Sequence, residues 1–188
     1  MSGRRKVAVL ISGRGSNLKA LIEADQDAYA IALVVSNVED APGLAYARAA
    51  GIPIFAHSHK GLKRAEFDAL VDAQLRAHGV EAVALAGYMR LLSPEFVARW
   101  AGRMVNIHPS LLPLHKGLDT HARAIEAGDA EHGCTVHLVT AELDAGPAIA
   151  QARVPVFPGD TPEALAERVL VEEHRLYPKA LAELVRTL

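Results

Sequence analysis

The sequence predicts an α/β fold in which a mostly parallel, twisted sheet carries helices on both faces, a Rossmann-like architecture. Short β-branched runs alternate with longer segments of helical period, which is typical of βαβ units. Residues 82–86 are apolar at every position, as expected for a central strand that is covered on both faces. The chain has 188 residues without a repeat or a long linker, so we expect a single domain with a substantial core.

The first half of the chain is predicted to alternate strands and helices, with glycines ending the helices. Gly51 and Gly79 stand where a helix must stop and the chain must turn. On the helix that Gly79 closes, six side chains fall on one face: Phe67, Leu70, Val71, Gln74, Leu75 and His78. The expected strands are residues 6–11, 31–36, a short run near Ile54, and 82–86; the expected helices run from the first glycine turn to about residue 24, over residues 41–50, and up to Gly79.

The second half is predicted to add shorter elements and then a long final helix. Ser93-Pro94-Glu95 marks a helix start, because it combines an N-cap serine, proline at the first helical position and an early carboxylate. Thr161-Pro162-Glu163 begins the final helix in the same way. The other expected elements are strands at residues 104–107, 134–140 and 148–156, the last two forming a hairpin, and a helix at 120–127.

Composition narrows the class of protein. The formal net charge is only −2, so nothing indicates a nucleic-acid-binding surface or an acidic tail. The single cysteine, Cys134, cannot build a disulfide framework within one chain and favours a reducing compartment. The apolar run at residues 7–11 is too short for a signal peptide or a membrane span. We therefore expect a cytoplasmic protein that acts on small molecules, as a monomer or a homodimer.

A glycine-rich turn follows the first expected strand and has the features of a phosphate-binding loop. Gly13 and Gly15 allow the backbone to approach a ligand, and the helix behind them presents free N–H groups to an anion. Ser16 and Asn17 add side-chain donors, and Arg14 adds a positive charge. No Gly-Lys-Ser/Thr follows and the third glycine of a dinucleotide fingerprint is missing. The alternative is a turn that only connects strand to helix.

Histidines are concentrated between the middle and the end of the chain, which raises the possibility of a metal site. Their spacing argues against zinc, because there is no His-Glu-x-x-His motif and one cysteine gives no thiolate pair. We therefore expect no metal. The clustered residues are His108, His115, His121, His132 and His137.

Asn106, His108 and Asp144 suit a different chemistry. Asn106 and His108 are two residues apart at the end of a strand, so their side chains point to the same side of the sheet. An asparagine can steady an oxyanion, a histidine can move a proton, and an aspartate can hold the imidazole in its protonated form. The spacing does not require Asp144 to meet His108, and Asp144 could equally cap its own Gly-Pro turn.

Six stretches, in order along nearly the whole chain, resemble the glycinamide ribonucleotide formyltransferases of the folate-dependent formyltransferase superfamily. The stretch from Asn106 to Pro113 is shared across the superfamily, whereas the glycine turn is more particular to this family. The matching stretches are ISGRGSNL (11–18), LAGYMRLLS (85–93), NIHPSLLP (106–113), EHG (131–133), TVH (135–137) and LDAGP (143–147).

The resemblance implies formyl transfer from 10-formyltetrahydrofolate to the amine of 5-phosphoribosylglycinamide, a step of purine synthesis. It implies that the N-terminal half binds the phosphate and that the C-terminal half carries the folate and catalytic loops. It assigns catalysis to Asn106, His108 and Asp144. The implied substrate-binding residues are Gly13, Arg14, Gly15, Ser16, Asn17 and Glu173, and the implied folate-binding residues are Arg64, Met89, Arg90, Leu91, Leu92 and Asn106.

Rival functions are distinguished by particular features. A formyltetrahydrofolate hydrolase shares the catalytic residues but adds an N-terminal regulatory domain, and a methionyl-tRNA formyltransferase adds a basic C-terminal domain; we expect neither here. A silent folate- or nucleotide-binding module would lack at least one catalytic residue. A nicotinamide-dependent reductase would place an acidic residue where Ser36 and Asn37 stand. The chain departs from its relatives at Leu114-His115-Lys116, and we assign His115 no role.

Overall fold

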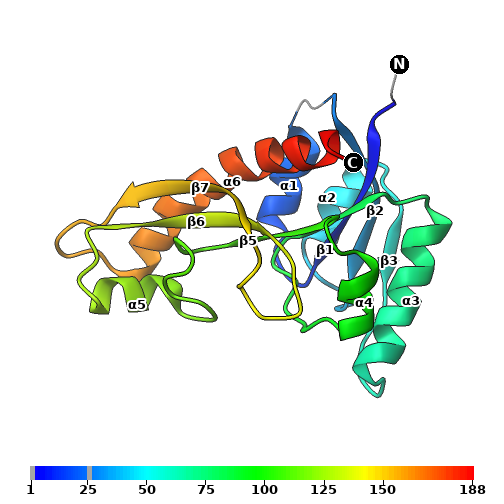
Figure 1. The fold of residues 1–188 in the computed structure, drawn as a ribbon, viewed down its shortest axis with the longest axis horizontal. Helices are drawn as coiled ribbons and strands as arrows, with labels where there is room; N and C mark the ends of the chain where they lie inside the picture. Colours follow the sequence, from blue (N-terminus) through cyan, green and yellow to red (C-terminus); the bar gives the residue numbers. More distant parts are fainter. Residues whose placement is uncertain (1–2, 25–26) are drawn as a thin grey trace.

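A computed structural model describes residues 3–24 and 27–188 and confirms the predicted α/β class (Figure 1). The strands form one seven-stranded sheet in the order β3-β2-β1-β4-β5-β6-β7. The elements are β1 (Arg5–Ile11), α1 (Ser16–Glu23), β2 (Tyr29–Ser36), α2 (Leu44–Ala49), β3 (Ile54–Ala56), α3 (Arg64–Ala77), β4 (Ala82–Leu85), α4 (Pro94–Arg99), β5 (Met104–His108), α5 (Thr120–Glu126), β6 (Glu131–Leu138), β7 (Ala148–Pro155) and α6 (Pro162–Arg186).

The sheet is parallel from β3 to β5 and then becomes antiparallel. β6 runs against β5, and β7 forms the predicted hairpin with β6. In the β5–β6 pair Asn106 lies opposite His137, and His108 lies opposite Thr135. The polar end of β5 therefore lies beside an antiparallel strand, β6. This strand adds side chains that a purely parallel sheet would not bring there.

Two separate apolar cores cover the two faces of the sheet. Along β1, the side chains of Val7, Val9 and Ile11 enter one core, while those of Ala8 and Leu10 enter the other. The first core is closed by α1, α2, α5 and α6, and the second by α3 and α4, so helices lie on both sides of the sheet in Figure 1. Burial of β1 on both faces explains why it reads as a continuous apolar run.

The predicted helix starts are present. The Ser93 hydroxyl accepts a hydrogen bond from the backbone N–H of Phe96 at the start of α4, and Thr161 accepts one from Ala164 at the start of α6. The first helix differs, because its N-cap is Gly15 in the left-handed conformation and no side chain caps it. The N–H groups of the first turn of α1 therefore have no side-chain acceptor at the cap.

On the apolar face of α3, Phe67 and Val71 are buried, whereas Leu70 is 41% exposed. Asp68 and Asp72 are buried on this helix instead. Asp72 accepts hydrogen bonds from the indole of Trp100 and the guanidinium of Arg99, so tertiary partners compensate for burial of the charge. A count of apolar residues could not reveal these partners.

The largest difference from the predicted strand boundaries is at the start of β6. The strand expected from residue 134 begins at Glu131, because β7 continues the ladder as far as the pair Glu131–Pro155. Local composition at Glu131 and His132 does not favour a strand, and the neighbouring strand supplies the reason. Within residues 3–24 and 27–188, no helix is long and apolar enough to cross a membrane.

Candidate active site

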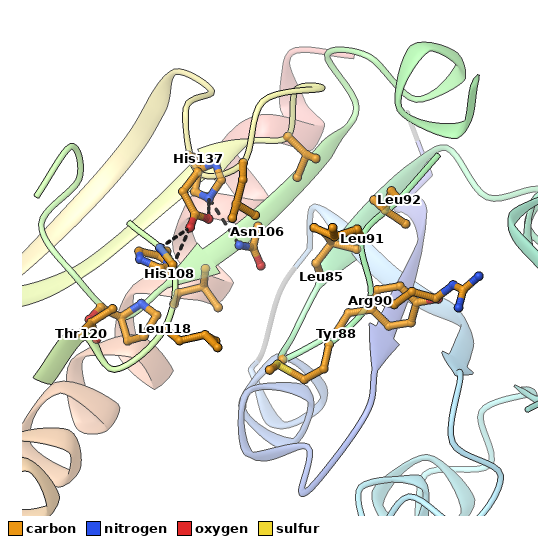
Figure 2. Close-up of a pocket in the computed structure, with 18 of the residues that line it drawn as sticks. Leu85, Tyr88, Arg90, Leu91, Leu92, Asn106, His108, Leu118, Thr120 and His137 are labelled. Carbon is orange, nitrogen blue, oxygen red and sulfur yellow. Dashed lines mark hydrogen bonds and ion pairs between the residues drawn. The ribbon is translucent and has the colours of Figure 1, made fainter. Parts of the chain in front are cut away.

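The carboxyl end of β5 carries two of the three predicted catalytic side chains. Figure 2 shows Asn106 and His108 on the same wall of a pocket, together with His137 from β6. The side chain of His108 is 8% exposed. In open α/β sheets this edge is where ligands bind, because the parallel strands all end there.

Asp144 is brought to His108 by the loop between β6 and β7. Its Oδ2 lies 3.5 Å from His108 Nδ1 and accepts a hydrogen bond of 3.0 Å from the backbone N–H of Gly117. Asp144 has a left-handed backbone, with φ of 51°. At Gly146 a Cβ atom would lie 1.7 Å from the carbonyl oxygen of Leu138, so only glycine fits. The loop after β6 is thus shaped to deliver this carboxylate.

The second ring nitrogen of His108 is also occupied. Nε2 lies 3.0 Å from the carbonyl oxygen of His115. Because a carbonyl can only accept, Nε2 carries the hydrogen and donates it. Nδ1 is therefore the nitrogen that faces the Asp144 carboxylate, across a gap at the limit of a direct hydrogen bond.

His137 belongs to the site, although sequence reasoning gave it no role. Its Nε2 lies 3.3 Å from Asn106 Nδ2, and its Nδ1 lies 3.0 Å from the carbonyl oxygen of Leu138. A neutral ring with hydrogen on Nδ1 satisfies both contacts. Burial lowers the pKa of His137 and outweighs the opposing effect of Asp144, whose Oδ1 is 3.8 Å away. The signal in the sequence is strand alternation, which places His137 and Thr135 on the same side.

The pocket in front of these residues has a volume of about 750 Å³. Figure 2 shows Tyr88, Leu91 and Leu92 across from the histidines. Much of the rim is apolar and exposed, with Met89 and Leu118 each 70% exposed. Large exposed apolar side chains around a cavity are typical of a ligand-binding site. Of the predicted folate-binding residues, five line the pocket and one does not: Met89, Arg90, Leu91, Leu92 and Asn106 line it, whereas Arg64 lies outside, exposed at the start of α3.

The glycine turn lies next to this pocket and reaches it through Asn17. A Cβ atom on Gly15 would lie 2.7 Å from the Cα of Gly43, so the close approach of the two backbones requires glycine. Asn17 Nδ2 donates to Glu173 Oε1 at 3.3 Å, and burial raises the pKa of Glu173. Of the predicted substrate-binding residues, Asn17 and Glu173 line the pocket, while Gly13, Arg14, Gly15 and Ser16 form the turn beside it.

A hydrogen-bonded chain ties the glycine turn to the loop that follows β4. The Ser12 hydroxyl donates to Asn37 Oδ1 at 2.5 Å and accepts from the backbone N–H of Met89 at 2.8 Å. The loops that follow β1, β2 and β4 are therefore joined through one hydroxyl group. This contact fixes the position of the glycine turn relative to the pocket wall.

The other three histidines of the cluster make side-chain pairs. His121 Nδ1 lies 3.1 Å from His132 Nε2, and His115 Nε2 lies 2.6 Å from Asp129 Oδ2. In the described parts of the chain, no group of three or more His, Cys, Asp or Glu side chains is arranged to hold a metal ion.

Acidification is expected to destabilise the fold through His132. Burial lowers the pKa of His132 to about 4, from 6.5 in the unfolded chain. The unfolded state therefore binds more protons between these values, so stability is fully present above pH 6.5 and is lost as the pH falls towards 4. The loss attributable to this group is about 3 kcal/mol. Urea unfolding at a series of pH values should show a shallower pH dependence for His132→Gln than for the wild type; equal slopes would contradict the assignment.

The chain is similar in sequence to proteins of known function. A profile of the family described as formyl transferase matches residues 5–181. The phosphoribosylglycinamide formyltransferase of Escherichia coli K12 is 46% identical over 180 residues, covering 94% of this chain and 85% of the relative.

Solved structures of similar proteins have the same fold as this chain. Glycinamide ribonucleotide transformylase 1 from Symbiobacterium toebii superposes with a TM-score of 0.94 at 43% identity, covering 100% of this chain and 90% of the other. Phosphoribosylglycinamide formyltransferase from Brucella melitensis gives a TM-score of 0.92 at 49% identity, with 97% and 96% covered.

Larger proteins also contain a matching segment. The human trifunctional purine biosynthetic protein adenosine-3 is 48% identical over 182 residues, which cover 95% of this chain. The chain spans only 18% of the length of that relative and 14% of the corresponding protein of Drosophila melanogaster.

Proposed function

This chain belongs to the formyl transferase family, and we propose that it transfers the formyl group of 10-formyltetrahydrofolate to the amine of 5-phosphoribosylglycinamide. The products are 5-phosphoribosyl-N-formylglycinamide and tetrahydrofolate, and the reaction belongs to de novo purine biosynthesis. The observation that carries the proposal is the convergence of Asn106, His108 and Asp144 on one wall of a pocket whose opposite wall is apolar.

Asn106 and His108 are assigned to stabilising the negative charge that develops during the reaction. The substrate amine attacks the formyl carbon, and the carbonyl oxygen becomes an oxyanion in a tetrahedral intermediate. Asn106 Nδ2 carries two hydrogens, of which the contact with His137 uses one, so the other is available to this oxyanion. One such donor is typically worth roughly 3 kcal/mol in the transition state.

His108 and Asp144 are assigned to proton transfer. The attacking nitrogen must lose a proton and N10 of the folate must gain one before the C–N10 bond breaks. The 3.5 Å gap between His108 Nδ1 and Asp144 Oδ2 suits a water or a reacting group that both contact. General acid–base catalysis of this kind contributes typically ~10²–10⁴ in rate. The transfer is direct and forms no covalent bond to the protein.

Substrate binding is divided between the two ends of the pocket. The phosphate is assigned to the uncapped N-terminus of α1 with Gly13, Arg14, Gly15 and Ser16, since a helix N-terminus attracts anions. The sugar hydroxyls are assigned to Glu173 and to Asn17 Oδ1, a buried acceptor without a partner among the described residues. The folate occupies the apolar side formed by residues 89–92, and Arg64 contacts it from outside the pocket.

A hydrolase with the same residues would release formate without an acceptor. The deciding experiment measures consumption of 10-formyltetrahydrofolate with and without phosphoribosylglycinamide. We expect consumption only when the acceptor is present, with formylated product in equal amount. Consumption without the acceptor would instead indicate a formyltetrahydrofolate hydrolase, and no consumption in either case would indicate a silent binding module.

A further inference from the structure

We propose that His115 is a positioning residue that holds the catalytic imidazole of His108 through its own backbone carbonyl. This inference rests on the proposed function, because it concerns the proton-transfer step assigned to His108. His115 lies in a segment between β5 and α5 that is neither helix nor strand. The segment nevertheless supplies backbone groups to both members of the His108–Asp144 pair.

Two backbone groups of this segment contact the His108–Asp144 pair. The carbonyl oxygen of His115 accepts from His108 Nε2 at 3.0 Å, and the N–H of Gly117 donates to Asp144 Oδ2 at 3.0 Å. With Nε2–H engaged, Nδ1 is the nitrogen left to exchange a proton on the side of Asp144. The carbonyl of His115 thus sets both the ring orientation and which nitrogen performs the transfer.

Contacts with other parts of the chain hold this segment in place. The side chain of His115 pairs with Asp129, with Nε2 2.6 Å from Oδ2, and is only 13% exposed. This pair joins the segment to the turn between α5 and β6. The Ser110 hydroxyl donates to the carbonyl of Leu114, and Arg123 donates to the carbonyl of Lys116. The His115–Asp129 pair is the contact linked most directly to the catalytic histidine, because the same residue, His115, also contacts His108 through its carbonyl.

The backbone of His115 explains why this anchor matters. His115 has φ of 51°, and Gly117 and Asp119 also have positive φ. Residues other than glycine occupy this region infrequently, so a residue that adopts it is held there by its surroundings. Loss of the Asp129 contact would allow the peptide unit of His115 to rotate away from His108. Small displacements of a catalytic group cost about 10²-fold in rate.

The test compares His115→Ala and Asp129→Ala with Lys116→Ala, whose side chain is exposed and makes no hydrogen bond within residues 3–24 and 27–188. We expect kcat to fall about 10- to 100-fold in the first two variants. KM for the phosphate-bearing substrate should stay unchanged, because its assigned site lies at α1. The Lys116→Ala variant should keep wild-type kcat. His115→Gln, which preserves a polar group near Asp129, should recover part of the loss.

Coupling provides a second criterion. The double variant His115→Ala/Asp129→Ala should lose no more activity than either single variant, because both remove the same contact. Additive losses would overturn the proposal, as would wild-type kcat in both His115→Ala and Asp129→Ala, or an equal loss in Lys116→Ala. Equal thermal midpoints for these variants would show that any loss of activity is not a loss of folding.

A measurement that needs no acceptor separates this proposal from the proposed function. In ¹⁵N-resolved NMR spectra of the free protein, the Nε2–H of His108 should give a slowly exchanging ring signal, assigned by its absence in His108→Ala. The signal should disappear in Asp129→Ala. A signal that persists unchanged there overturns the positioning role, whatever reaction the protein performs. An inactive wild type with the expected spectra would overturn the proposed function alone.

Discussion

Replacing His108 with alanine is expected to lower kcat by about 10³-fold or more while leaving folate binding nearly intact. The imidazole is assigned to stabilising the negative charge of the tetrahedral intermediate and to moving the proton, whereas the folate is assigned to the apolar wall across the pocket. Single-turnover kinetics measure the chemical step, and fluorescence titration with a non-reactive folate analogue measures binding.

The control for this variant is His57→Ala, which removes an exposed histidine that does not line the pocket. It should keep wild-type kcat. His108→Gln adds a further distinction, because an amide can donate a hydrogen bond but cannot shuttle a proton. We expect it to remain close to His108→Ala. Wild-type-like turnover in His108→Ala would exclude the assigned role.

Replacing Asp144 with asparagine is expected to lower kcat by about 10²- to 10³-fold with little change in the thermal midpoint. The substitution removes the charge that faces His108 Nδ1 but keeps the size of the side chain. Asparagine also accepts the left-handed backbone of this position readily, so the loop after β6 should stay in place. Steady-state kinetics and thermal unfolding measure the two effects.

Asp40→Asn is the control, because Asp40 is also an aspartate on a loop, but it is exposed and does not line the pocket. Its kcat should stay within about threefold of the wild type, since exposed polar substitutions rarely have larger effects. A loss in Asp40→Asn as large as that in Asp144→Asn would show that the effect does not depend on the carboxylate beside His108.

The predicted elements agree with the structure where the signal is local. Strand alternation, the Ser-Pro-Glu and Thr-Pro-Glu helix starts and the glycine turn depend on residues close in sequence, and each is present. The exposure of Leu70 and the burial of Asp72 do not follow from the helical pattern, because they depend on what packs beside α3. An apolar period indicates that a helix has a buried face, and the partners decide where that face ends.

By itself, the sequence determined the fold class, the position of Asn106 and His108 at a strand end, and the resemblance to a formyltransferase family. These follow from period, turn chemistry and motif order, which the chain encodes locally. Only the tertiary structure decided that Asp144 and the carbonyl of His115 meet the imidazole of His108, and that His137 meets Asn106. Their meeting depends on an antiparallel strand register and on two loops closed by distant contacts, and spacing along the chain does not specify such geometry.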